Sequence, residues 1–143
     1  MIKTLGFEKI VHLLGFKENP YPYLKNADYL VSTSNAEGFP NGIAEAMCLG
    51  KPVIATNCQS GPAEILTGND ATQTNSFLCA GHGILCEVNN VKAVSQAVDN
   101  IEGNEQIAVY QQKSLARADT FSYAAMQTTF KQLLTIAIKS KVK

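Results

Sequence analysis

Short apolar runs alternate with stretches of helical periodicity along this chain of 143 residues. Four of the apolar runs are flanked by turn residues, and they predict buried β-strands over residues 11–15, 28–34, 53–56 and 83–88. A short helical turn is expected over residues 20–27, between the first two strands. Strands that alternate with helices favour a parallel sheet with helices on both of its faces. The expected fold class is therefore α/β.

Two helices are predicted from start and stop signals in the middle of the chain. Asn41 predicts the N-cap of a helix over about 42–49, and Gly50 marks its end. The inward face of this helix is expected to consist of Ile43, Ala46, Met47 and Leu49. The turn at 60–62 predicts the start of a second, shorter helix that stops at Gly68.

A loop and three further helices are predicted in the C-terminal half. Residues 69–82 are polar and rich in turn formers, so they predict a surface loop. Asn90 predicts the N-cap of a helix that runs to Gly103, and residues 104–118 predict the next one. The Asn90 helix has apolar residues at helical spacing, which are Val91, Val94, Val98 and Ile101. The last helix, over about 122–140, has one apolar face made of Met126, Phe130, Leu133, Leu134 and Ala137.

Composition and charge place the chain among ordinary globular domains. Hydrophobic residues make up 45% and charged residues 17% of the sequence, and its length fits one domain. Twelve Lys and Arg balance twelve Asp and Glu, which argues against a basic face for nucleic acid. No apolar run approaches the roughly 18 residues of a membrane span, and residues 1–20 lack the pattern of a signal peptide. A single domain over 1–143 with a cytoplasmic location is therefore expected.

The cysteines give no sign of a disulfide framework or a metal site. None of the four forms a C-x-x-C pair, and all have apolar or small neighbours; they are Cys48, Cys58, Cys79 and Cys86. This pattern favours free thiols over disulfides. A zinc site that combines them with His12 and His82 has no ligand spacing to support it, so no metal is predicted.

The candidate chemistry is concentrated in residues 37–64, where a predicted strand ends and a helix begins. Ligands of open α/β folds bind at this carboxyl edge of the sheet. Glu37 lies in the loop, and Glu45 lies eight positions later in the early turns of the helix. The helix N-terminus between them suits a diphosphate, and the two carboxylates suit the hydroxyls of a sugar and of a ribose. The pattern is therefore typical of a nucleotide-sugar site.

Other motifs and plainer interpretations compete with this site. The chain contains no G-x-G-x-x-G and no G-x-S-x-G, and the pair at 50–51 lacks the rest of a Walker A loop. Glu45 also fits a solvated acid in the first helical turn, and Glu37 a plain surface residue. Glu64 is interpreted as a cap partner, and His82 as a loop residue. On the residues alone these alternatives stay open.

In its motif order, the segment closely resembles the retaining glycosyltransferases of group 1 (family 4), which share the GT-B fold of two Rossmann domains. Their signature is a Glu, seven residues and a second Glu, then a helix, GKPVIAT and an SGP turn; here it occupies 37–45, 50–56 and 60–65. The resemblance covers nearly the whole chain, with 69–82 its least typical part. It implies a Rossmann-like sheet flanked by helices that forms the greater part of the C-terminal half of a GT-B fold.

The resemblance also implies a role for each matching residue. Glu37 is expected to be the catalytic carboxylate that faces the donor sugar, and Glu45 to hold the ribose hydroxyls. The backbone amides expected to approach the sugar and the diphosphate are those of Gly38, Phe39, Asn41 and Gly42. The loop at Gly15 and Phe16 is expected to lie against the base. The resemblance implies no metal and no cofactor, with a nucleotide-diphosphate sugar as the donor substrate.

The implied activity is transfer of a hexose to a saccharide or lipid-linked acceptor, as in bacterial polysaccharide or lipid-linked oligosaccharide assembly. The family's N-terminal acceptor domain, and the basic pair that neutralises the diphosphate, are not expected in this sequence. The isolated chain is therefore expected to supply only the donor-binding part and to be inactive alone. The alternative is a truncated, non-catalytic domain that binds a nucleotide weakly or only self-associates.

Two further partners are expected from the C-terminal part of the sequence. Without an N-terminal domain, the apolar face of the helix at 122–140 must pack on this domain or on a second copy, which would make a homodimer. The basic tail at 139–143 suggests weak association with the inner face of a membrane.

Overall fold

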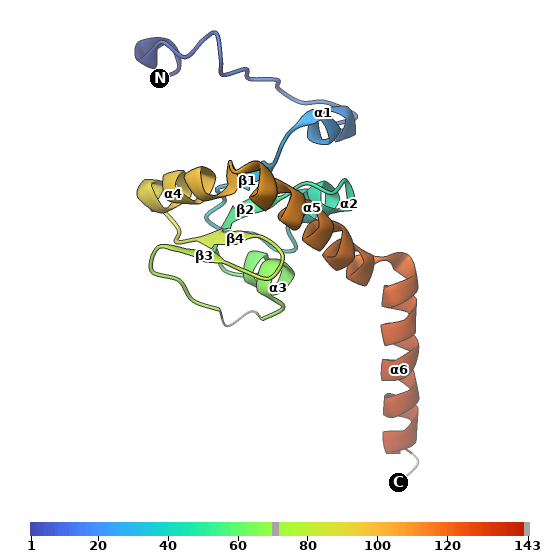
Figure 1. Cartoon of the computed structure of the whole chain (residues 1–143). Coiled ribbons are helices and arrows are strands. Elements are labelled where there is room, and N and C mark those ends of the chain that lie inside the picture. The colour runs from blue at the N-terminus through green and yellow to red at the C-terminus, as the bar shows by residue number, and fades with distance from the viewer. Residues whose placement is uncertain (70–71, 142–143) are drawn as a thin grey trace.

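Four strands form one mostly parallel sheet in the computed structural model, which describes residues 1–69 and 72–141 (Figure 1). The strand order is β1-β2-β4-β3, and the strands span Leu30–Ser32 (β1), Val53–Thr56 (β2), Phe77–Cys79 (β3) and Ile84–Cys86 (β4). β1, β2 and β4 run parallel, and β3 pairs with β4 in the antiparallel sense. The predicted α/β class is confirmed.

The helices of the described residues follow the predicted alternation with strands. They are η1 (Lys3–Leu5), α1 (Tyr21–Asn26), α2 (Asn41–Cys48), α3 (Pro62–Thr67), α4 (Val91–Ile101), α5 (Asn104–Ala118), η2 (Asp119–Phe121) and α6 (Tyr123–Lys141). α2 and α3 pack on one face of the sheet, and α4 packs on the other. The core is therefore divided into two layers by the sheet.

β2 is buried along its whole length because both of its faces are covered. Val53 and Ala55 belong to the layer with α2 and α3, whereas Ile54 belongs to the layer with α4. Successive side chains of a strand point to opposite faces, so each layer receives alternate residues. A strand buried on both faces carries an unbroken apolar run, which is why it could be predicted from the sequence.

α5 joins the start of β2 to α3 through hydrogen bonds from its side chains. Ser114 Oγ donates to the carbonyl oxygen of Lys51 over 2.9 Å. Arg117 Nε donates to the carbonyl of Ile65 over 2.9 Å, and its Nη2 donates to the carbonyl of Glu64 over 2.7 Å. Because carbonyls near the end of a short helix have few partners within the helix, Arg117 stabilises α3 from outside.

Several predicted helix ends are confirmed by their backbone conformation. Asn90 Oδ1 accepts a hydrogen bond from the amide of Ala93 over 2.9 Å, as an N-cap does. Gly50 and Gly68 lie in the left-handed region, with φ of 69° and 82°, just after α2 and α3. α5 spans the residues predicted for it, 104–118.

One detail of the predicted helices, the N-cap at Asn41, is wrong. Asn41 is the first residue of α2 and makes no side-chain cap bond; the carbonyl of Pro40 instead accepts from the amides of Ile43 and Ala44. Of the apolar residues at helical spacing on α4, Ile101 is buried and Val94 and Val98 pack against the core, whereas Val91 at the start of the helix is 83% exposed.

The predicted surface loop at 69–82 is wrong in part, because it contains β3. Leu78 pairs with Leu85 of β4, which makes β3 the antiparallel edge of the sheet. β3 has three residues, of which Leu78 and Cys79 are exposed, so its apolar signal is too short to separate from the surrounding turn formers.

The predicted strand at 11–15 is absent. Its apolar residues are exposed, with Leu13 at 85% and Leu14 at 48%, and the segment extends away from the sheet (Figure 1). A strand needs a neighbour for its backbone groups and a covered face for its side chains. β1 is the nearest edge of the sheet, and its partner within the described residues is β2 alone.

α6 projects from the body of the domain after η2 (Figure 1). Its predicted apolar face is exposed, with Phe130 at 62% and Leu133 at 60%. Extended backbone at Ser122 turns the chain outward, so packing on the domain itself is limited to a cavity that Met126, Phe130 and Leu133 share with Phe39 and Phe121. Packing on a second copy stays a prediction. No helix among residues 1–69 and 72–141 combines the length and apolarity needed to cross a bilayer.

Candidate functional site

Two loops at the carboxyl edge of the sheet pack against each other. The first follows β1 over residues 33–40, and the second follows β2 over residues 57–61. Ala36 and Gln59 form a parallel bridge between them. A β-carbon at Gly61 would lie 2.4 Å from Cδ of Pro40 and 3.0 Å from the carbonyl oxygen of Gly38. This approach is closer than any residue with a side chain allows, so the glycine is what lets the loops meet.

Glu37 is half-buried within the first loop. One of its carboxylate oxygens, Oε1, accepts a hydrogen bond from Ser34 Oγ over 2.6 Å. Ser34 is fixed in turn, because Thr56 Oγ1 donates to its carbonyl oxygen over 2.5 Å. The carboxylate of Glu37 is therefore held in place by the end of β2 rather than free in solvent.

α2 begins directly after this loop. The amide of Asn41 donates to the carbonyl of Phe39 over 2.9 Å, so this amide is engaged inside the turn. A β-carbon at Gly38 or Gly42 would meet nothing within 4 Å, so the backbone there borders open space. Glu45 is the fifth residue of α2 and is half-buried, which places it beyond the first turn. The simpler interpretation of Glu45 as a first-turn acid is therefore wrong.

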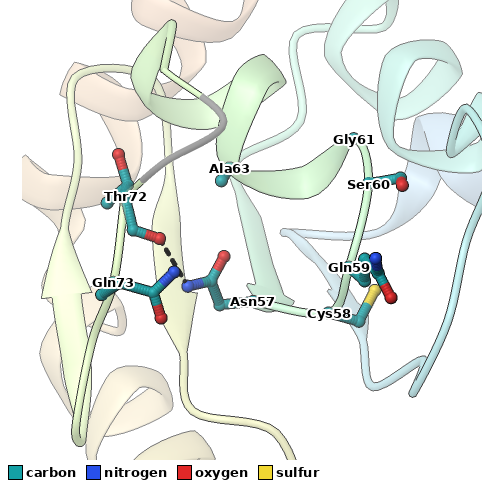
Figure 2. Close-up of a pocket in the computed structure, with 8 residues that line it drawn as sticks. All are labelled: Asn57, Cys58, Gln59, Ser60, Gly61, Ala63, Thr72 and Gln73. Atoms are coloured by element: carbon teal, nitrogen blue, oxygen red, sulfur yellow. Dashed lines mark hydrogen bonds between the residues drawn. The ribbon is translucent and has the colours of Figure 1, made fainter.

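A polar cavity of about 440 Å³ borders the second loop (Figure 2). Its lining consists of Asn57, Cys58, Gln59, Ser60, Gly61, Ala63, Thr72 and Gln73. Asn57 Nδ2 donates to the carbonyl oxygen of Thr72 over 2.9 Å, which ties the segment before β3 to the end of β2 (Figure 2). Amides and hydroxyls of this kind can bind the hydroxyls of a sugar.

Sequence reasoning missed most of this lining. Polar residues directly after the apolar run at 53–56 were a usable signal for Asn57 and Gln59, since they stand at a carboxyl edge. Thr72 and Gln73 could not be found in this way, because only the folded chain brings them beside Asn57.

The remaining predicted site residues, Phe39, Gly15 and Phe16, do not all lie beside Glu37 and Glu45. The ring of Phe39 lies edge-on to that of Phe121 with 5.7 Å between centroids, so its side chain turns toward η2 while its backbone stays in the loop. Gly15 and Phe16 lie in the extended N-terminal segment, where Phe16 is 93% exposed. The contacts of the described residues do not join this segment to the carboxyl edge, and its role against a base stays a prediction.

Cys58 is one of the residues that line the polar cavity. It is 4% exposed, and burial first, then the charge of Glu37, raises the pKa of its thiol above the ordinary value. Burial raises the pKa of the Cys86 thiol to about 11. All four cysteines are free, and Cys48 and Cys79 are exposed. Among the described residues no group of three His, Cys, Asp or Glu side chains could hold a metal ion.

We expect two of the four thiols to react quickly with a disulfide reagent in the native protein at pH 7.5, those of Cys48 and Cys79. Cys58 and Cys86 are buried, and burial raises the pKa of both thiols, which keeps the attacking thiolate form scarce. The Cys86 thiol stays protonated until about pH 11, so raising the pH from 7.5 to 9 should leave its reaction slow. Four fast thiols before unfolding would contradict the burial of Cys58; the control is the full count of four in denaturant.

The fold and the site together define a class of protein: a Rossmann-like α/β domain with two acidic residues at the carboxyl edge of its sheet. The family model for "Glycosyl transferases group 1" matches residues 1–118. The chain therefore belongs to this family, and it corresponds to part of the C-terminal domain of the GT-B fold.

Relatives of known sequence agree with this family. The chain is 31% identical over 122 residues to a Campylobacter jejuni enzyme, N-acetylgalactosamine-N,N'-diacetylbacillosaminyl-diphospho-undecaprenol 4-alpha-N-acetylgalactosaminyltransferase, a match that covers 85% of this chain and 30% of that one. It is 44% identical over 66 residues to an uncharacterized glycosyltransferase of Methanocaldococcus jannaschii, covering 46% of this chain and 16% of that protein. The chain thus spans a third or less of the length of these relatives.

Solved structures share the fold. The crystal structure of Anabaena HepE in complex with UDP has a TM-score of 0.76 and 23% identity, and the match covers 94% of this chain and 34% of that one. The C-terminal domain of a group 1 glycosyl transferase from Francisella tularensis has a TM-score of 0.63 and 21% identity, covering 83% of this chain and 57% of that one.

Proposed function

We propose that this chain is the donor-binding part of a retaining glycosyltransferase, which transfers a hexose from a nucleoside-diphosphate sugar to a lipid-linked or saccharide acceptor. The observation that carries the proposal is the fixed carboxylate of Glu37 at the junction of two packed loops, directly before α2. Glu45 follows it on α2 and is half-buried.

Glu37 is assigned to the hydroxyls of the donor sugar. Oε1 is occupied by the Ser34 hydroxyl, and a carboxylate has further lone pairs on both oxygens with which to accept from a ligand. A group that is held before the ligand arrives loses little entropy on binding, which favours a defined sugar orientation. The polar cavity beside residues 57–61 lies next to this loop and offers room for the sugar or its acceptor.

The diphosphate is assigned to the open backbone at the start of α2. The exposed glycines Gly38 and Gly42 allow close approach, and a helix N-terminus carries about half a positive charge. Negative charge grows on the diphosphate as it leaves, so stabilising it there lowers the barrier. Glu45 is assigned to the ribose hydroxyls, one turn farther along α2.

The relatives indicate which donors and acceptors to test first. HepE has been crystallised with UDP and with UDP-glucose, and the Campylobacter jejuni relative is named for transfer of N-acetylgalactosamine to a diphospho-undecaprenol-linked saccharide. UDP-hexoses are therefore the first probes. Because the chain spans only about a third of the length of such relatives, we assign the acceptor to a separate domain and expect no sugar transfer by this chain alone.

Titration calorimetry of the full chain with nucleoside diphosphates tests the proposal. We expect saturable binding of at least one of UDP, GDP and ADP with a Kd between about 1 μM and 1 mM, the range of ordinary enzyme KM values. The matching monophosphate should bind several-fold more weakly, because it lacks the phosphate assigned to α2. Absence of heat and of NMR shift changes with all three diphosphates would contradict the proposal and favour a non-catalytic domain.

A further inference from the structure

We infer that Ser34 is a positioning residue for the donor sugar. Its hydroxyl holds the carboxylate of Glu37, and its own carbonyl is held by Thr56 at the end of β2. This inference rests on the proposed function of Glu37. It goes further by assigning roles to Ser34 and Thr56, which neither contact the sugar themselves nor belong to the spaced pair of glutamates.

A direct hydrogen bond joins Ser34 to Glu37. Ser34 Oγ donates to Oε1 of Glu37 over 2.6 Å, which is a short distance typical of a hydroxyl on a charged oxygen. A hydroxyl has a single proton, so this bond commits the only side-chain donor of Ser34 to the carboxylate. Both residues are half-buried, which shields the bond from competition by water.

Ser34 is itself anchored by Thr56. Thr56 is the last residue of β2 and is 4% exposed, and its Oγ1 donates to the carbonyl oxygen of Ser34 over 2.5 Å. Ser34 lies two residues beyond the end of β1, so its backbone is not held by the ladder between the strands. The hydroxyl of Thr56 extends the connection between β1 and β2 into the loop.

The two bonds form one chain from the sheet to the carboxylate. A buried polar side chain needs a partner, and Thr56 finds it in the loop rather than in its own strand. The orientation of Glu37 therefore depends on the position of β2, and the loss of either hydroxyl frees the carboxylate to rotate. A rotating carboxylate must lose side-chain entropy when a sugar binds, so the sugar binds more weakly while UDP does not.

The test compares two ligands on a series of variants. Kd values for UDP and for the best of four UDP-hexoses (glucose, galactose and their N-acetylamino forms) are measured on the full chain. Glu37→Ala and Ser34→Ala should each weaken the UDP-hexose by about tenfold and change the Kd of UDP by less than about twofold. Ser34→Thr keeps the hydroxyl and should restore most of the lost affinity.

The double variant separates positioning from an independent contact. If Ser34 acts through Glu37, Ser34→Ala combined with Glu37→Ala binds the UDP-hexose no more weakly than Glu37→Ala alone. Ser114→Ala is the matched control, since Ser114 is a buried serine that bonds the carbonyl of Lys51 outside the site. It should lower the melting temperature without changing the ratio of the two Kd values.

The outcomes distinguish failure of the inference from failure of the proposed function. Equal weakening of UDP and UDP-hexose by Ser34→Ala would show a merely structural role and overturn the inference, as would additive losses in the double variant. Unchanged UDP-hexose affinity in Glu37→Ala would overturn it by removing the role of Glu37. A wild-type chain that binds neither ligand would overturn the proposed function, and this inference with it.

Discussion

Replacement of Gly61 by alanine is expected to lower the free energy of unfolding by about 3 kcal/mol and to weaken UDP binding at least tenfold. The new β-carbon would lie 2.4 Å from Cδ of Pro40 and 3.0 Å from the carbonyl of Gly38. Neither atom belongs to a flexible side chain, so the two loops must separate. Gly61 also has φ of 96°, a conformation that costs any other residue additional free energy. Because Pro40 directly precedes α2, the displacement reaches the assigned diphosphate site.

Gly68→Ala separates the effect of the positive φ from the effect of the close contact with Pro40 and Gly38. Gly68 has a similar left-handed φ of 82°, but a β-carbon there would meet nothing within 4 Å. We expect this control to lose about 1 kcal/mol by urea unfolding and to keep its UDP affinity. If Gly61→Ala were no worse than Gly68→Ala in both measurements, the close packing of the two loops would be wrong.

The parts of the fold that were predicted correctly are those whose signal is local. β2 could be recognised because an unbroken apolar run marks a strand buried on both faces. Asn90 and Gly68 mark the start of α4 and the end of α3 through backbone geometry that few other residues favour. These signals do not depend on what packs against the element.

The parts that were predicted wrongly depend on a partner. Residues 11–15 have the pattern of a buried strand but pair with no strand of the described residues. The apolar face of α6 stays exposed, although its start shares an apolar cavity with Phe39 and Phe121. An apolar pattern predicts that a face will be buried, but it does not identify the element or the protein that buries it. β3 is the reverse case. Its apolar pattern is weak, but the segment forms a strand because it pairs with the edge of β4.

In the candidate site, too, local signals could be predicted from the sequence and contacts between distant segments could not. Glu37 and Glu45 were found from their spacing around a loop and a helix start, which the structure reproduces. The hydrogen bonds of Ser34 and Thr56 were not foreseen, because they join the ends of two strands that are neighbours only in the sheet. Spacing along the chain identifies candidate ligand-binding residues such as Glu37. The hydrogen bonds that orient Glu37 depend on Thr56 of the neighbouring strand, which the spacing does not reveal.

Glu45→Ala is expected to weaken UDP and UDP-hexose binding equally, by about 10- to 100-fold, because the ribose common to both ligands loses a charged acceptor. Glu45 lies in the second turn of α2 and outside its buried face of Ile43, Ala46 and Met47. Alanine favours a helix interior, so the melting temperature should stay the same or rise slightly. A variant that loses binding while keeping its stability would separate a ligand contact from a structural role.

Two controls make this result decisive. Glu64→Ala removes an exposed acid from the first turn of α3, so it matches the change in charge without touching α2. It should leave both Kd values within about twofold of the wild type. Glu45→Gln keeps an oxygen that accepts hydrogen bonds and should recover part of the affinity, since a neutral acceptor binds hydroxyls more weakly than a carboxylate does. If Glu45→Ala bound UDP as tightly as the wild type, the ribose would have to be assigned elsewhere on the carboxyl edge, and the eight-residue spacing from Glu37 would lose its functional meaning.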